Sequence, residues 1–174
     1  MGAGTDTSSD SGPTGVVTED ARAFADALPE GGVLLGLDPG TKTIGTAFCD
    51  AGWSFASPGK TLPKGKFTRD RAVLAELCGQ RGVAGVVIGL PLNMDGTSGP
   101  RAQAARAFAK NLADGQRGLG LPVLLWDERW STQSAERDMI GMDMSRGKRA
   151  ERIDSHAAAV ILQGAIDRLA GGIL

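Results

Sequence analysis

The chain has 174 residues, of which 41% are hydrophobic and 22% charged, with 19 Lys and Arg against 20 Asp and Glu. This composition predicts one globular domain and excludes a collagen-like repeat, a disulfide scaffold and a wholly disordered chain. The longest apolar runs are far shorter than the roughly 20 residues that span a bilayer, and no secretory signal is recognisable. The two cysteines, Cys49 and Cys78, are far apart in the sequence. We therefore expect a cytoplasmic protein without a membrane partner.

Charge is divided unevenly along the chain. Residues 1–32 hold six acidic side chains and one basic side chain, which leaves 14 acidic and 18 basic side chains for residues 33–174. The net charge near zero is therefore the sum of an acidic head and a basic body. A basic body favours a nucleic-acid partner.

The acidic head divides further into two segments. Residues 1–15 are mostly Gly, Ser, Thr, Asp and Pro, which predicts a flexible tail. Residues 16–32 are predicted to form a short helical acidic extension, because Phe24 and Leu28 recur at helical spacing after Thr18, a candidate N-cap. The main domain is then expected over residues 33–174.

The hydrophobic pattern of this domain predicts strands and helices in the order βββαβαβαα. The predicted strands are 33–38, 43–49, a third around 53–56, 83–90 and 121–126, and the predicted helices are 70–80, 98–112, 131–140 and 154–169. The first three strands are expected to be antiparallel, since a Pro-Gly turn separates the first two. The order is that of an α/β domain.

Three acidic residues fall at the ends of predicted elements. Asp38 ends the first strand, Glu128 follows the fifth strand, and Asp154 begins the last helix. Parallel strands would bring Asp38 and Glu128 to one edge of the sheet, where oxygen ligands suit Mg²⁺ or Mn²⁺. Two such ions would clamp the attacking and leaving oxygens of a phosphodiester. Each acid also has a structural explanation: a turn residue at Asp38, a helix cap at Asp154, and a partner of Arg129 at Glu128.

Four segments resemble the YqgF/RuvX family of RNase H-like nucleases, in the family's order and spacing. They are LDPGTKTIG at 37–45, VIGLPLNMDGT at 87–97, DERWST at 127–132 and IDS at 153–155. The family is described as Holliday junction resolvases and as nucleases that mature the 5′ end of 16S ribosomal RNA. The resemblance runs from about Val33 onward. It implies an RNase H-like fold with a five-stranded mixed sheet flanked by helices on both faces.

By this resemblance, Asp38, Glu128 and Asp154 are catalytic carboxylates that bind Mg²⁺ or Mn²⁺. The implied enzyme is a hydrolase acting on ester bonds, a metal-dependent endonuclease. Structured RNA, as precursor 16S ribosomal RNA cut at its 5′ end, is the favoured substrate. Branched DNA is the alternative, with a four-way junction cut by a homodimer, whereas RNA processing needs only a monomer.

Eight further residues are candidates for substrate binding. They are Thr41, Lys42, Asn93, Arg129, Thr132, Arg146, Lys148 and Arg149. The last three belong to a basic segment, 145–152, that is predicted to be a mobile loop before the final helix. The loop 93–97 either contacts nucleic acid or caps the helix that begins near residue 98. Glu151, three residues before Asp154, is a candidate fourth ligand if that helix starts early.

Two other classes of protein stay open at this point. Segment 38–45 also resembles the phosphate loop of actin-like and sugar-kinase-like proteins. Those proteins bind nucleotide between two such domains, and 174 residues provide only one. A nucleic-acid-binding module without catalytic activity would share the basic surface but would not depend on the three carboxylates.

Overall fold

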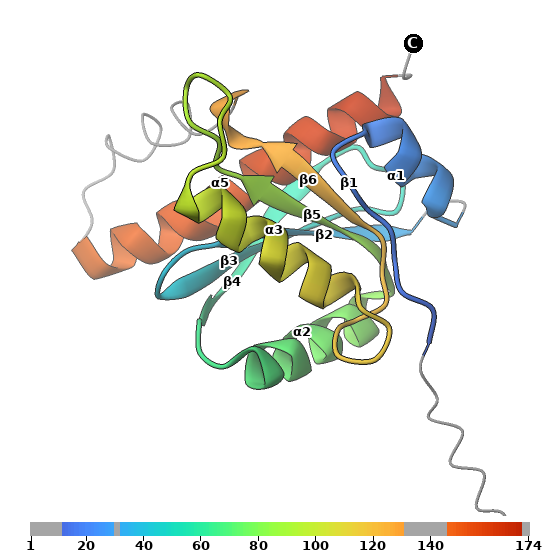
Figure 1. The fold of residues 1–174 in the computed structure, drawn as a ribbon, viewed down its shortest axis with the longest axis horizontal. Coiled ribbons are helices and arrows are strands. Elements are labelled where there is room, and N and C mark those ends of the chain that lie inside the picture. Colours follow the sequence, from blue (N-terminus) through green and yellow to red (C-terminus); the bar gives the residue numbers. More distant parts are fainter. Residues whose placement is uncertain (1–11, 30–31, 131–145, 172–174) are drawn as a thin grey trace, which may run out of the picture.

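In the computed structural model, the described residues are 12–29, 32–130 and 146–171, and the side chains of Trp130 and of residues 146–154 are not among them. A single sheet lies between two layers of helices (Figure 1). The strands are β1 (Val17–Thr18), β2 (Val33–Pro39), β3 (Thr43–Cys49), β4 (Ala56–Pro63), β5 (Val83–Leu90) and β6 (Val123–Asp127). The helices are α1 (Ala21–Ala27), α2 (Phe67–Arg81), α3 (Pro100–Ala113) and α5 (Arg146–Ala170), and a 3₁₀ turn, η1, spans Glu128–Trp130.

The sheet is mixed and has the order β1-β6-β5-β2-β3-β4. Strands β2, β3 and β4 are antiparallel neighbours, whereas β2, β5 and β6 are parallel, with β5 in the middle. The predicted architecture, a mixed sheet with helices on both faces, is confirmed. The strand count differs, because Val17 and Thr18 pair in parallel with Val123 and Leu124 and add a sixth strand. Two residues are too few to produce a recognisable strand pattern.

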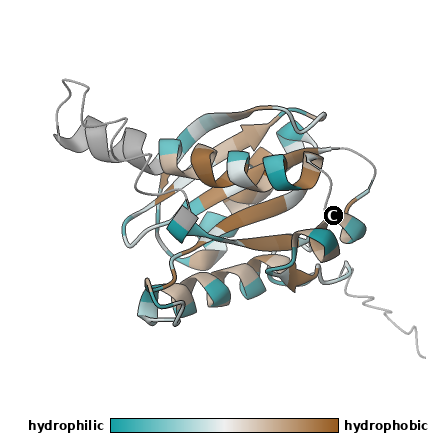
Figure 2. Cartoon of the chain, turned by 90° about the horizontal axis from the view of Figure 1, so that it is seen from above, coloured by the Kyte–Doolittle hydropathy of each residue, from teal (hydrophilic) through white to brown (hydrophobic). Residues whose placement is uncertain are grey.

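The two faces of the sheet carry separate hydrophobic clusters. On one face, Leu35, Leu37 and Ile88 pack beneath α2 and α3, and on the other, Leu34 and Val87 pack beneath α5 and α1. Alternate residues of a strand point to opposite faces, so one run of apolar residues fills both layers. Figure 2 shows the apolar sides of the helices turned toward the sheet.

The predicted third strand at 53–56 is wrong, because β4 spans Ala56–Pro63. Trp53 instead has a positive φ of 57° in the turn before β4. That turn is closed by Asp50, whose Oδ1 accepts hydrogen bonds from the N–H groups of Ser54 at 3.0 Å and Phe55 at 2.7 Å. The prolines and the glycine of β4 make it hard to recognise as a strand in the sequence. β4 is an edge strand, however, and an edge strand tolerates prolines, which cannot donate a backbone hydrogen bond to a neighbouring strand.

The final helix begins eight residues earlier than predicted, at Arg146 rather than Asp154. The predicted loop at 145–152 is therefore wrong for residues 146–152. Arg, Lys, Ala and Glu are strong helix formers, and they outweigh the single unfavourable Gly147. The predicted helix at 131–140 lies outside the described residues.

The acidic extension contains the predicted helix, α1, but Asp20 rather than Thr18 caps it. Asp20 Oδ1 accepts a hydrogen bond from Arg22 N at 2.9 Å. Phe24 is fully buried in the cluster beneath α5. The predicted tail at 1–15 lies mostly outside the described residues, and its last residue, Gly15, donates to Ala113 O at 2.8 Å. The division at residue 32 stays a prediction.

Within the described ranges, no helix combines the length and the apolarity that crossing a membrane requires.

Candidate active site

Asp38 and Glu128 lie at one edge of the sheet, on either side of β5. Asp38 is near the end of β2, and Glu128 directly follows β6. The register that pairs Leu37 with Ile88 puts Asp38 level with Gly89, and the one that pairs Leu90 with Asp127 puts Glu128 just beyond Leu90. The side chain of Glu128 lies back over Gly89. The predicted meeting of these two acids at the carboxyl edge is confirmed, since their side chains share a hydrogen bond.

Gly89 provides the space that the carboxyl group of Glu128 occupies. A Cβ atom at this position would lie 2.9 Å from Glu128 Cδ and 2.7 Å from Ile161 Cδ1. The Glu128 carboxyl therefore lies directly over the backbone of β5. Sequence reasoning did not identify Gly89 as a functional position. The available signal was a glycine inside a buried strand, which often marks the close approach of another group.

The pair is electrostatically strained. The pKa of Glu128 is raised to about 7, first by burial, then by the negative charge of Asp38 and the hydrogen bond with it. The positive charge of Arg101 lowers the same pKa by less, and Asp127 raises it slightly. The Glu128 carboxyl therefore holds its proton up to a higher pH than an ordinary glutamate does. A divalent cation is the natural replacement for that proton, because it neutralises both charges and prefers oxygen ligands.

Helix α5 passes over the same edge. Ser155 is buried, and its Oγ lies 2.5 Å from Thr61 Oγ1. Thr61 pairs with Gly45, which pairs with Asp38 across the antiparallel strands. The helix at residue 155 is therefore level with the row of the sheet that contains Asp38.

Asp154 immediately precedes Ser155 in α5, and its side chain lies outside the described residues. The prediction that Asp154 begins the helix is wrong, because α5 starts at Arg146. Because α5 starts early, Glu151 is in the same helix, three residues before Asp154. This is the spacing that puts two residues on one helix face. Among the described side chains, no three His, Cys, Asp or Glu come together as a metal cluster.

The turn after Asp38 carries two of the predicted substrate-binding residues. Gly40 N donates to Thr43 O at 2.8 Å, which closes the turn, and Thr41 and Lys42 are exposed at its tip. A pocket opens beside this turn, between the N-terminal end of α3 and the end of β4. It is lined by Pro39, Gly40, Thr41, Lys64, Pro91, Arg101, Ala104 and Ala105.

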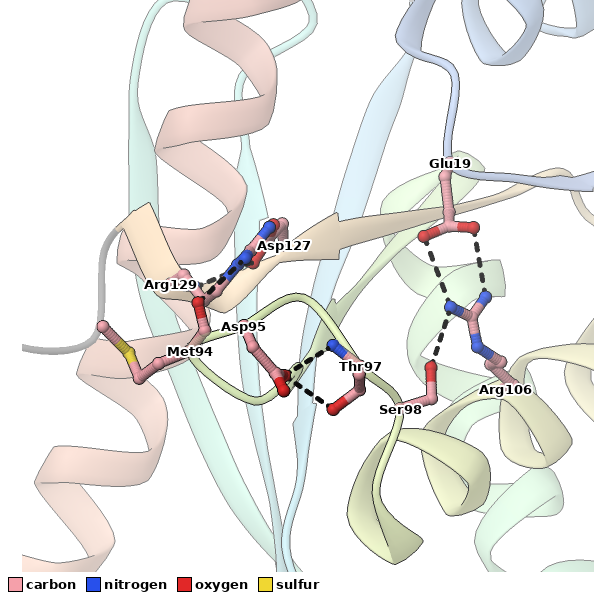
Figure 3. Close-up of polar contacts among 8 residues, drawn as sticks. All are labelled: Glu19, Met94, Asp95, Thr97, Ser98, Arg106, Asp127 and Arg129. Atoms are coloured by element: carbon pink, nitrogen blue, oxygen red, sulfur yellow. Dashed lines mark hydrogen bonds and ion pairs between the residues drawn. The ribbon is translucent and has the colours of Figure 1, made fainter.

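The loop after β5 closes on itself rather than on the helix that follows. Asn93 Nδ2 donates to Thr97 Oγ1 at 2.9 Å. Thr97 N donates in turn to Asp95 Oδ1 at 3.0 Å (Figure 3). These bonds from Thr97 lower the pKa of Asp95. The capping alternative for this loop is wrong, because α3 is preceded by Gly99 without a side-chain cap. Asn93 is exposed and level with the carboxyl edge of the sheet.

Arg129 is already paired. Its Nη2 lies 2.7 Å from Asp127 Oδ2, and its Nη1 donates to Met94 O at 3.4 Å (Figure 3). The bond to Asp127 raises the pKa of the guanidinium. The ion pair described for Arg129 is therefore with Asp127, and a pairing with Glu128 stays a prediction. Four other candidates cannot be placed: Thr132 lies outside the described residues, as do the side chains of Arg146, Lys148 and Arg149.

Comparison with known proteins gives a consistent family. The family model described as "RuvX: Holliday junction resolvase" matches residues 32–168. A protein of Novosphingobium aromaticivorans named "Putative pre-16S rRNA nuclease" is 62% identical over 156 residues, covering 90% of this chain and 98% of that protein. A protein of Sphingopyxis alaskensis with the same name is 62% identical over 154 residues, covering 88% and 99%.

Among solved structures, RuvC of T. thermophilus in complex with a Holliday junction substrate is 16% identical. It has a TM-score of 0.49 and covers 80% of this chain and 96% of its own. The family model spans well over half of the sequence, and the two relatives match across nearly their whole length. On these matches, the chain belongs to the RuvX family.

Proposed function

We propose that this protein is a metal-dependent endonuclease that hydrolyses phosphodiester bonds and matures the 5′ end of precursor 16S ribosomal RNA. The observation that carries the proposal is the hydrogen-bonded pair of Asp38 and Glu128 above Gly89. Two carboxyls so close, one with its pKa raised to about 7, form a site for a divalent cation. The names of the two close relatives support the choice of RNA.

Asp38 and Glu128, together with Asp154 of α5, would hold Mg²⁺ or Mn²⁺. The bound cation supplies positive charge that activates water and stabilises the negative charge developing on the phosphate. The chain's own contribution is positional. Gly89 leaves room for the Glu128 carboxyl, the closed turn at Gly40 fixes the end of β2, and the burial of Glu128 keeps water away from one side of the pair.

The same site would cut either RNA or branched DNA, so the choice between these substrates depends on whether the protein is a monomer or a homodimer. A single domain suffices for one cut in an RNA strand, whereas a four-way DNA junction needs two sites in one homodimer. We favour a monomer acting on structured RNA in the cytoplasm. Branched DNA remains the second candidate, because the matching family model is described by Holliday junction resolution.

The test is cleavage of a precursor RNA and of a four-way DNA junction by the wild type and by Asp38→Asn, with Mg²⁺ and with Mn²⁺. We expect the wild type to form the 5′ end of the RNA and the variant to lose activity by on the order of 10³-fold or more. Asp26→Asn, an exposed acid on α1, is the matched control and should keep wild-type activity. Full activity of Asp38→Asn would refute the assignment, and cleavage of the junction alone would transfer it to the second candidate.

A further inference from the structure

The pocket beside Asp38 is lined by two positively charged side chains that have no role in the proposed catalysis. It lies between the turn after β2, the end of β4 and the first turns of α3. Lys64 and Arg101 are the charged side chains that line it. The turn directly follows Asp38, so the pocket opens at the same edge of the sheet as the carboxyl pair.

Lys64 is held in place by several contacts. Its backbone N–H donates to Lys42 O at 2.9 Å, and its Nζ donates to Gly40 O at 2.9 Å. The next residue, Gly65, donates its N–H to both carboxylate oxygens of the buried Asp70, at 3.2 and 3.0 Å. An ammonium group has three protons to donate, and the bond to Gly40 uses one. A lysine fixed in this way loses less side-chain entropy when it binds an anion than a free surface lysine does.

Arg101 is the second residue of α3 and is exposed. Within the described ranges, its guanidinium makes no hydrogen bond and no ion pair, in contrast to Arg129. Its charge is nevertheless close enough to lower the pKa of Glu128. The guanidinium thus offers five donors beside the carboxyl pair, in the fork geometry that fits phosphate oxygens.

We propose that Lys64 and Arg101, with the hydroxyl of Thr41, bind a phosphodiester group of the RNA strand next to the one that is cut. This inference rests on the proposed function, because it assumes that the ligand is the strand being cleaved. The pair sets the register of the strand, since phosphate contacts position a nucleic acid without reading its sequence. It also places positive charge near the carboxylates without occupying the position of the cation.

Binding of a single-stranded RNA without metal tests the inference separately from cleavage. The variants are Arg101→Ala and Lys64→Gln, since glutamine keeps a donor for Gly40 O while it removes the charge. Each should bind about fivefold more weakly at 0.1 M salt, and the slope of log K against log salt should flatten by about 0.7. Arg22→Ala, on α1 and far from the carboxyl edge, is the matched control and should bind as the wild type does. Thermal unfolding checks that all variants fold.

A neutral linkage identifies the phosphate. Replacing one phosphate beside the cleavage position by methylphosphonate should weaken wild-type binding to the level of Arg101→Ala, and should weaken Arg101→Ala no further. Variants with the salt slope of Arg22→Ala would overturn the inference even if cleavage is confirmed. If the wild type cuts neither substrate but the slopes flatten as expected, the proposed function fails and the phosphate site stands.

Discussion

The two faces of the sheet differ in the residues that the same two strands, β2 and β5, place on them. Beneath α2 and α3, β2 and β5 contribute large aliphatic side chains, among them Leu35, Leu37 and Ile88, all fully buried. Beneath α5, the alternate positions hold the buried Leu34 and Val87, but also Gly36, Asp38 and Gly89. One face is therefore filled for packing. The other leaves space for a closely packed helix and for two carboxyl groups.

Glycine residues make the close packing beneath α5 sterically possible. A Cβ atom at Gly36 would lie 2.8 Å from Leu162 Cβ and 3.0 Å from Ala158 O, so α5 packs directly on the backbone of β2. At Gly89 the same space is taken by the Glu128 carboxyl. The polar site is therefore part of the α5 layer itself, not a patch on its surface. Changes that add charge or volume to this layer should have the largest effects.

The largest effect is expected from ionising the carboxyl pair. The pKa of Glu128 is about 7 in the folded protein against an ordinary value of 4.5, so the folded state binds this proton more tightly than the unfolded state. The resulting stability is complete below pH 4.5 and is lost as the pH rises through 7, a decrease of up to about 3 kcal/mol in the free energy of unfolding. Urea unfolding at pH 5 and pH 8 in EDTA measures it.

Glu128→Gln is the matched control for this titration. The amide keeps the shape of the side chain but does not ionise, so its stability relative to the wild type should increase from pH 5 to pH 8. Other acids titrate in both proteins, and the difference between the two curves removes their contribution. Parallel curves would show that Glu128 ionises at its ordinary pKa and that the α5 layer carries no electrostatic strain.

The next largest effect is expected from Gly89→Ala. The added methyl group would overlap the Glu128 carboxyl and Ile161 Cδ1, both of which are ends of flexible side chains. The fold should therefore survive while the carboxyl moves away from Asp38. A displacement of about 1 Å in a catalytic group lowers the rate by on the order of 10²-fold. Cleavage kinetics of the precursor RNA, together with thermal unfolding, would measure both consequences.

Gly79→Ala controls for the change of residue type. Gly79 lies in α2, and no atom lies within 4 Å of a Cβ atom added there. This variant should gain about 0.5–1 kcal/mol in stability, because alanine favours helix, and should keep wild-type activity. Equal activity in the two variants would mean that the space at Gly89 has no catalytic importance.

Much of the difference between the two faces of the sheet is predictable from the sequence. Parallel strands force Asp38 and Glu128 to one edge, and the order of strands and helices is sufficient to predict that. The position of Asp127 in a strand also predicts that it points away from Glu128, as its pairing with Arg129 shows. Strand direction and the alternation of side chains along a strand are therefore enough to place these three acids.

The remainder depends on distances between segments far apart in the sequence. Nothing in the residues around Lys64 indicates that its Nζ reaches Gly40 O, or that Arg101 of α3 lies near Glu128. The early start of α5 escapes prediction for a different reason. A cluster of basic residues with one glycine is typical of a loop, although helix propensity favours the opposite assignment here.

The smallest effect is expected on the opposite face, from Asp127→Asn. The ion pair between Asp127 and Arg129 is partly exposed, with side-chain exposures of 22% and 29%, so it contributes less than about 1 kcal/mol. Asparagine still accepts the bond from Arg129 N that Asp127 Oδ1 accepts at 3.0 Å. Removing this minor charge should lower the pKa of Glu128 only slightly.

A double-mutant cycle of Asp127→Asn with Arg129→Met isolates the energy of this pair from the other effects of each change. We expect a coupling below about 1 kcal/mol in urea unfolding and a pH dependence of stability close to that of the wild type. A larger coupling would contradict the small energy expected of a partly exposed pair, and loss of the pH dependence would mean that the two faces are not independent. The charges beneath α3 would then set the ionisation of Glu128 through the sheet, and the contrast between a packed face and a charged face would no longer hold.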